Sequence, residues 1–360
     1  MKSGAITSRQ LGILAFLSVL SPIVRLLPNS AISEAGSAAW LSTLLASAAA
    51  VFFVILLSFL LRKTGKCAEN LFSRSLGAFF GGLFSAIYAL WLVFYCGIVL
   101  RASVERLVSA LYPESAPWLF MIVTAAALTV PLSMKKKALF RAAEIVLPLI
   151  VGCLAFVFIF SVKDIRPRFL LPVGLDGAGG TAAGAIPVLE IFSVFAFFLL
   201  ASHEVSDPER LMRESAKWTG LAGIAAFLLC VVTIGTSSAP LCADFLSPAL
   251  TVVRNIRLFG TDARVDSVIF AVWVITDLAL MASLLKIARE LLAALLPKSA
   301  VRLLPAAEPA AVLLTAVLIS GGATGVAFWS EKAAPAVNAV LAALVLPLVL
   351  TVGLIRKNSR

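Results

Sequence analysis

Long apolar runs recur along almost the whole chain, and they restrict the possible folds more than any other feature of the sequence. A helix needs about 20 mostly apolar residues to cross a bilayer. Hydrophobic residues make up 61% of the 360 residues and charged residues only 14%, too little charge to cover a soluble domain of this size. We therefore predict a single all-α integral membrane domain over residues 1–360, with about ten transmembrane helices. The predicted spans are 11–28, 38–61, 76–111, 117–134, 138–160, 185–201, 217–235, 265–295, 309–328 and 335–355.

The positions of lysine and arginine predict how the chain is oriented in the membrane. Cytoplasmic loops of membrane proteins carry an excess of these residues. With the N-terminus in the cytoplasm, 20 of the 30 Lys and Arg residues fall on the cytoplasmic side, and nine, Arg106 among them, on the other. We therefore expect a multi-pass protein of the cell membrane, in contact with membrane lipid, with both termini cytoplasmic. This distribution accounts for the net charge of +11 without a nucleic-acid partner.

The predicted spans divide into two groups of five, 11–160 and 185–355, which suggests an inverted repeat. Because each group has an odd number of spans, the second group must lie upside down relative to the first. Transporters built this way bind their substrates near the middle of the membrane, at helices that are discontinuous. We therefore expect Gly or Pro to interrupt the first span of each group.

The stretch LSPIVRLLP, residues 20–28, fits such an interruption in the first span. Pro22 removes one backbone donor, and the carbonyls it frees are tolerated in a membrane only where they face protein or a water-filled cavity. Arg25 costs at least ~2.5 kcal/mol at the centre of a membrane helix. Ser21, Pro22 and Arg25 are therefore candidate ligand-binding residues beside a broken helix. Alternatively, Arg25 extends its long side chain to the outer interface, because Pro28 looks like the end of the span.

Glu190, three residues after Pro187, holds the corresponding place in the second group. It could bind an ammonium group of a ligand, or it could pair with Arg25 if the two interrupted helices meet. The alternative is an interfacial carboxylate at a helix start, where the helix dipole favours negative charge.

Asp277 lies near the middle of the span 265–295, beside Thr276 and one turn after Trp273. No cationic residue is within one turn of it in the sequence. An ionisable residue at such depth points to a functional site, so Asp277 and Thr276 are candidates for binding a cation or a proton. Alternatively, a protonated Asp277 hydrogen bonds across helices.

Tyr88, Trp91 and Tyr95 follow i, i+3, i+7 spacing and share one face of the third span. Such an aromatic stripe commonly packs against neighbouring helices. It could also line the ligand pocket, so all three are candidate ligand-binding residues.

The sequence gives no reason to expect an enzyme, a metal site or a cofactor. Paired carboxylates, a nucleophile with a base and a phosphate-binding loop are not found at useful spacing. The five cysteines are scattered without a metal-ligand pattern. His203 and Glu204 belong to a charged loop that we interpret as a solvated helix start.

Three stretches resemble the B subunits of spore germinant receptors, the GerAB family of the amino acid–polyamine–organocation transporter superfamily. They are ITSRQLGILAFL at 6–17, GSAAWLSTLLASAAA at 36–50 and SPALTVVRNIRLFGTDARVDSVIFAVWVI at 247–275. The last is similar to the family's Glu-Arg-Leu-Asp segment and following Trp, with Ala263, Arg264, Val265, Asp266 and Trp273 in those places. The family's glycine-rich break in the first span is replaced by residues 20–25, so Arg25 could bind a ligand carboxylate or fill the pocket.

This resemblance implies a LeuT-like fold and a subunit of the spore inner membrane. It implies a small germinant, commonly an amino acid, as ligand, and A-type and C-type receptor subunits as partners. An H⁺- or Na⁺-coupled amino acid permease is the alternative function.

Overall fold

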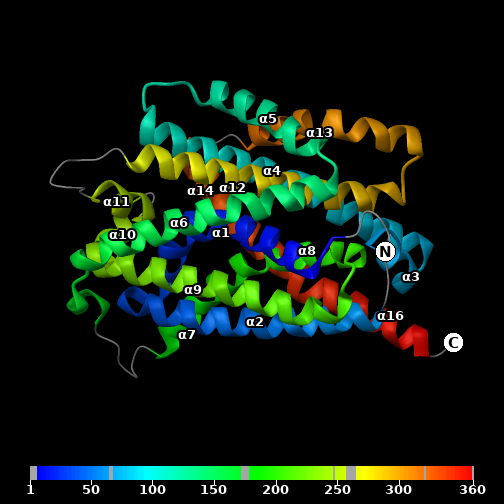
Figure 1. The fold of residues 1–360 in the computed structure, drawn as a ribbon, viewed down its shortest axis with the longest axis horizontal. Helices are drawn as coiled ribbons and strands as arrows, with labels where there is room; N and C mark the ends of the chain where they lie inside the picture. The colour runs from blue at the N-terminus through cyan, green and yellow to red at the C-terminus, as the bar shows by residue number, and fades with distance from the viewer. Residues whose placement is uncertain are drawn as a thin grey trace.

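The computed structural model describes residues 6–64, 68–171, 178–245, 248–256, 265–319 and 322–358. Within these ranges the protein is all-helical, apart from one isolated bridge between Ile6 and Val205. Most of the long helices run roughly along the long axis of the molecule, and α1 begins at the same end at which α16 finishes (Figure 1). The expected all-α class is confirmed.

The described α-helices differ widely in length. They are α1 Ser8–Ala35, α2 Ala39–Thr64, α3 Ala68–Leu76, α4 Ala78–Leu111, α5 Pro117–Ser133, α6 Lys136–Ser161, α7 Ala178–Phe192, α8 Val194–Leu199, α9 Leu211–Ser237, α10 Ala239–Asp244, α11 Pro248–Arg254, α12 Val265–Ala293, α13 Lys298–Leu318, α14 Gly322–Ala327, α15 Ala334–Ala339 and α16 Leu346–Asn358. Short 3-10 turns are η1 Gly36–Ala38, η2 Val162–Asp164, η3 Pro167–Leu170, η5 Leu200–Glu204 and η6 Pro208–Arg210, and two π-helical segments are η7 Phe328–Ala333 and η8 Val340–Val345.

Helix α1 is the central helix of the bundle and is continuous. Thr7 and Gln10 form a capping box at its start. It packs against α6, α7, α9 and α12, and its residues are buried almost without interruption as far as Pro28. The predicted break at Pro22 is therefore wrong. A proline removes one hydrogen bond of the helix, and here the surrounding helices keep the chain helical through both Pro22 and Pro28.

The corresponding span of the second half is broken, but at Ser193 and not at Pro187. Pro187 lies inside α7, and the turn at Ser193 separates α7 from α8. The Ser193 hydroxyl donates to the Glu190 carbonyl at 2.5 Å, which supplies a partner for a backbone group at this break. After α8 the chain continues as the 3-10 turn η5. The expected discontinuity thus exists in one of the two helices.

The predicted ninth span is misplaced. Helix α13 runs over Lys298–Leu318 and contains Pro305 and Pro309, whereas 309–328 was expected. The next helical segment includes the π-helical η7 and η8 before α16. The predicted span begins at Pro309, yet both Pro305 and Pro309 lie within α13, just as Pro22 and Pro28 lie within α1.

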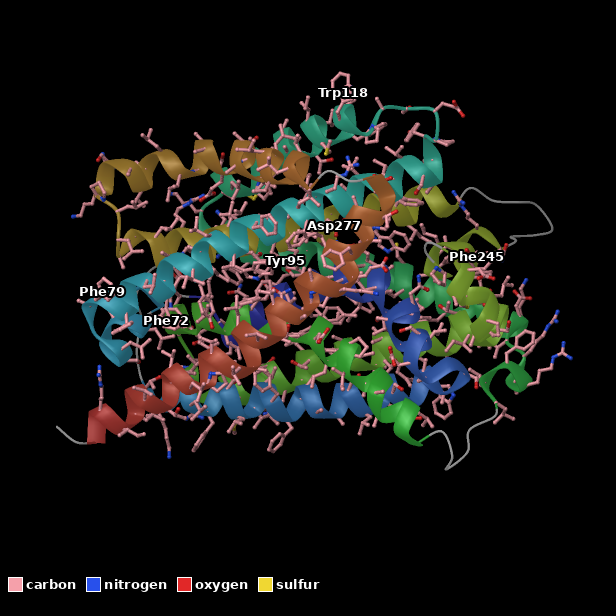
Figure 2. All side chains as sticks on the ribbon, turned by 180° about the vertical axis from the view of Figure 1, so that it is seen from behind. Phe72, Phe79, Tyr95, Trp118, Phe245 and Asp277 are labelled. Atoms are coloured by element: carbon pink, nitrogen blue, oxygen red, sulfur yellow. The ribbon has the colours of Figure 1, made fainter. Side chains whose placement is uncertain are left out.

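Eight helical segments of the described chain are long and apolar enough to cross a membrane. One of them, 8–64, contains both α1 and α2 with the short turn η1 between them, and α5 has only 17 residues. The exact count of ten spans stays a prediction, as do the bounds of the two repeats. Large apolar side chains face outward, among them Phe79 and Trp118 at 78% and 60% exposure (Figure 2), as expected for a lipid-facing surface.

Candidate functional site

Asp277 of α12 is the centre of a buried polar cluster in the core of the bundle (Figure 2). It is 1% exposed, and its Oδ2 lies 3.0 Å from Nη2 of Arg106 on α4. The Ser103 hydroxyl donates to the same oxygen at 2.5 Å, and the Ser21 hydroxyl of α1 donates to Oδ1. Three helices are thereby joined through one carboxylate, which is paired and hydrogen bonded as a buried charge requires.

Arg106 corrects one prediction made from the sequence. The charge distribution places it on the outer side of the membrane, but it is 8% exposed and lies in the core. The sequence has no cationic residue within one turn of Asp277, and Arg106 pairs with it from another helix. Arg106 follows Tyr95 by eleven residues, about three helical turns, so extending the aromatic stripe along α4 would have found it.

Arg25 of α1 is buried in the same region, at 7% exposure. All three of its guanidinium nitrogens are buried and without a hydrogen-bond partner in the described part of the chain. It does not extend to the interface, so that alternative is wrong. Arg106, Tyr95 and the half-buried Glu331 are close enough to interact with it electrostatically.

Glu190 is not brought to Arg25. It is half-buried on α7, and no ion pair between the two is found among the described residues. Glu331, a residue that the sequence interpretation did not select, is the acidic side chain that interacts with Arg25. In the sequence, Glu331 is a polar residue just before the predicted span 335–355, and nothing distinguishes it there from an ordinary loop residue.

The aromatic stripe of α4 faces the π-helical part of the last helical segment. The Tyr88 hydroxyl donates to the Leu341 carbonyl in η8 at 2.6 Å. The Trp91 indole N–H donates to Oδ1 of Asn338 at 2.8 Å and its ring stacks on Tyr95, with centroids 6.4 Å apart. Tyr88 is thus engaged in packing, while the buried Tyr95 stacks on Trp91 and is near enough to Arg25 to interact with it electrostatically.

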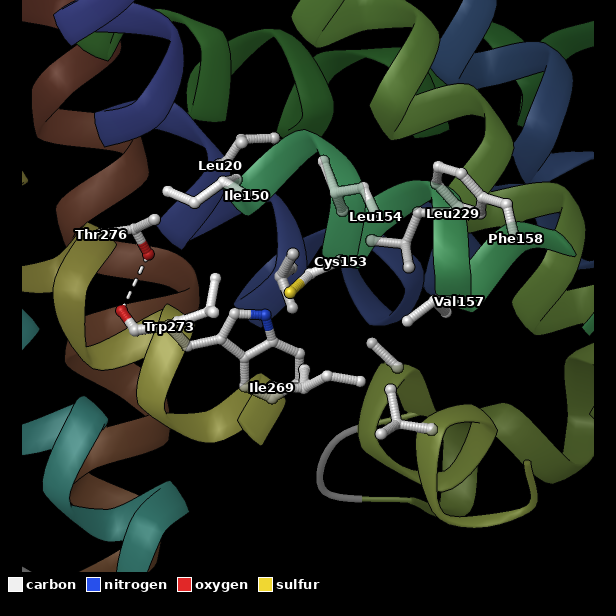
Figure 3. A pocket seen from close by; sticks show the side chains of 14 residues that line it. Leu20, Ile150, Cys153, Leu154, Val157, Phe158, Leu229, Ile269, Trp273 and Thr276 are labelled. Atoms are coloured by element: carbon white, nitrogen blue, oxygen red, sulfur yellow. Dashed lines mark hydrogen bonds between the residues drawn. The ribbon is translucent and has the colours of Figure 1, made fainter. Parts of the chain in front are cut away.

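Thr276 and Trp273 line a small apolar cavity next to the cluster (Figure 3). Its volume is about 40 Å³, room for a water molecule and no ligand of amino acid size. The Thr276 hydroxyl donates to the Trp273 carbonyl at 2.8 Å, so it is already engaged within its own helix. The Arg106 guanidinium stands over the Trp273 ring, 5.9 Å from its centroid. Thr276 also lines a second apolar cavity, of about 190 Å³, on another side of α12 together with Leu14, Leu17 and Ala279.

A larger cavity of about 720 Å³ opens at the end of the bundle opposite the two termini. Lys163, Arg166 and Arg254 line it together with Asp164, so its walls are mainly basic. The neighbouring Val252 and Val253 line this cavity and the small apolar one respectively, so the two cavities adjoin.

At the end that carries the termini, charged side chains close the bundle. Lys136 at the start of α6 pairs with Glu204 at 2.7 Å and with the buried Glu290 of α12. The His203 Nε2 lies 3.9 Å from a carboxylate oxygen of each of these two acids. His203, Glu204 and Glu290 could coordinate a cation by geometry alone, but the Lys136 ammonium already pairs with one oxygen of each carboxylate. We define Lys136, His203, Glu204 and Glu290 as the inner cluster.

Comparisons with known proteins identify the fold and the family of related sequences. A family model described as "Spore germination protein" matches residues 5–321. A Na⁺-coupled sialic acid symporter, solved substrate-bound and outward-open, is similar in structure with a TM-score of 0.64 and 13% identity, over 98% of this chain and 88% of that one. A manganese transporter of Eremococcus coleocola is similar with a TM-score of 0.59 and 13% identity, over 96% of this chain and 78% of that one. The fold is therefore LeuT-like. No curated protein sequence matches the chain.

Proposed function

The chain belongs to the spore germination protein family, and on that premise we propose that it is the ligand-sensing membrane subunit of a germinant receptor. It is a permease-like membrane protein. It binds a small germinant, such as an amino acid, where α1, α4 and α12 meet, and the bound ligand signals germination. The observation that supports this most is Arg25, whose buried guanidinium has no hydrogen-bond partner among the described residues and lies in the same region as the Arg106–Asp277 pair.

The remaining assignments follow from the same proposal. The subunit lies in the spore inner membrane with both termini in the cytoplasm, and it works with an A-type membrane subunit and a C-type lipoprotein. Support for the orientation comes from the excess of Lys and Arg on that side and from the common end at which α1 begins and α16 finishes. No catalytic step is assigned to the chain.

Spores that lack this chain test the proposal. We expect them to lose the response to one class of germinant, and to regain it when the wild-type gene is returned. An affinity tag on the chain should bring down an A-type subunit and a lipoprotein from spore membranes. Unchanged germination with every germinant, together with purification of the chain by itself, would contradict the receptor assignment.

A second candidate function is ion-coupled transport. It is favoured by the similarity to the Na⁺-coupled symporter and by Asp277, a buried carboxylate that contacts two helices. Purified protein in liposomes should then accumulate a labelled amino acid when a proton or sodium gradient is imposed, and Asp277→Asn should abolish the accumulation. Uptake that is independent of any gradient would exclude coupling.

A further inference from the structure

Arg25 carries a charge that no contact with the described residues neutralises. Its guanidinium has five N–H donors and no acceptor, and none of its nitrogens has a hydrogen-bond partner in the described ranges. An unpaired buried charge is costly, and proteins ordinarily keep such a group only when it is paired. Arg25 therefore indicates a site that is complete only when an additional group is bound.

The charges around Arg25 identify the sign of that group. Two buried cations, Arg25 and Arg106, repel each other across the cluster. Asp277 is the fully buried anion, and Arg106, Ser21 and Ser103 already occupy its two oxygens. Glu331 attracts Arg25 but is only half-buried and forms no contact ion pair with it within the described residues. The cluster therefore has an excess of buried positive charge.

The face of α1 that carries Arg25 has further unused polar groups. Ser18, Ser21 and Arg25 follow i, i+3, i+7 spacing and are all buried. The Ser18 hydroxyl has no partner in the part of the chain that the structure describes. Because Pro22 has no N–H, the Ser18 carbonyl also lacks its usual helical donor. The unused donors, a hydroxyl and a guanidinium on one face, suit an anion with two oxygens.

We propose that Arg25 is the carboxylate-binding residue of the germinant site, and that the site recognises small carboxylate anions whether or not they carry an ammonium group. This rests on the proposed function for the existence of a ligand. A planar carboxylate accepts two parallel hydrogen bonds from a guanidinium, which gives both affinity and orientation. An ammonium group is not required because the buried acid of the cluster is already engaged by Arg106.

Replacing Arg25 and Arg106, each in turn, by methionine tests whether Arg25 is unpaired, and this test needs no ligand. Methionine retains the length and apolar stem of arginine and removes the charge. In ligand-free detergent solution, we expect Arg25→Met to leave the melting temperature unchanged or to raise it, because an uncompensated charge is removed. Arg106→Met should lower it, because Asp277 then loses its cation. A clear fall with Arg25→Met would overturn the proposal, since it would mean that Arg25 has a structural partner.

A ligand titration then tests the chemistry. Sodium formate, sodium acetate, sodium L-lactate and L-alanine are added to the wild type at constant ionic strength made up with sodium chloride. We expect at least lactate and alanine to raise the melting temperature, with apparent affinities within tenfold of each other. L-alaninamide, which keeps the ammonium group and lacks the carboxylate, should give no shift. Arg25→Met should abolish the shifts, Arg25→Lys should weaken them, and Arg141→Gln on the exposed start of α6 should leave them unchanged.

Each other outcome counts against the inference. A shift with L-alaninamide, shifts that persist in Arg25→Met, or no shift with any of the carboxylates would each overturn it. These outcomes are separate from failure of the proposed function, which is decided by the germination of spores that lack the chain. If germination requires the chain but the purified protein does not respond to any carboxylate, the receptor role stands and the proposed role of Arg25 is wrong.

Discussion

Arg106 and Asp277 are 171 residues apart in the sequence, yet their side chains meet at 3.0 Å in the core. The pair joins α4 to α12, and through Ser21 the same carboxylate also holds α1. These contacts therefore fix how α1, α4 and α12 pack against one another in the core. The pair thus combines a structural role with a position next to the unpaired Arg25.

Breaking this pair should be strongly destabilising. We expect Arg106→Gln and Asp277→Asn each to lower the free energy of unfolding by about 3–5 kcal/mol, because each leaves a buried group without its partner. The double variant should lose less than the sum of the two. The measurement is a double-mutant cycle on detergent-solubilised protein by thermal or denaturant unfolding. Strict additivity would mean that the two side chains do not interact in solution.

Gly97 of α4 should not tolerate a side chain. A Cβ at this position would lie 2.0 Å from the Thr315 hydroxyl of α13 and 3.0 Å from the Ala316 backbone nitrogen, so the two helices would have to move apart. We expect Gly97→Ala to cost about 1–3 kcal/mol of stability through overpacking. Gly152→Ala in α6 is the matched control, because nothing lies within 4 Å of a Cβ there. If Gly97→Ala, Gly152→Ala and the wild type all have the same free energy of unfolding, the close packing of α4 and α13 is wrong.

The inner cluster should control access from the end that carries the termini. Lys136→Gln removes the cation that pairs with Glu204 and Glu290, and the two carboxylates then repel each other. We expect a cysteine placed at the buried Ser283, which lines the small cavity beside this cluster, to be labelled several-fold faster by a membrane-impermeant reagent. The background has no other cysteine, and the exposed Lys137→Gln serves as control. An unchanged labelling rate in Lys136→Gln would show that the cluster does not close this end.

Tyr88 and Tyr95 should differ in what their hydroxyls do. Tyr88→Phe removes one of two donors to the buried Leu341 carbonyl, which keeps the backbone N–H of Leu346, so it should cost about 0.5–1.5 kcal/mol of stability. It should leave carboxylate affinity unchanged. Tyr95→Phe should alter carboxylate affinity, because Tyr95 interacts with Arg25. Thermal unfolding and the lactate titration measure the two effects, and a change of affinity in Tyr88→Phe alone would reverse the assignment.

Some features of the chain could be predicted from its sequence because they depend on local composition. Apolar runs long enough to cross a bilayer gave the all-helical membrane class, and most predicted spans overlap a described helix closely, as 117–134 does with α5. The depth of Asp277 was also predictable in outline, since a charge in the middle of an apolar run is expected to face the interior, whereas for Arg25 the sequence left burial and extension to the interface both open. Such conclusions need only the free energy of transferring a side chain or a backbone group out of water.

Tertiary packing decided the rest. Whether Pro22 breaks α1 depended on the helices around it, because a proline removes one hydrogen bond and the neighbours determine whether the chain bends. Which cation would reach Asp277 depended on how α4 and α12 are rotated against each other, and nothing in the sequence near either residue encodes that angle. Arg106 and Arg25 are both arginines in apolar helices, and only the packing of whole helix faces gave Arg106 an acidic partner and left Arg25 without one among the residues that the structure describes.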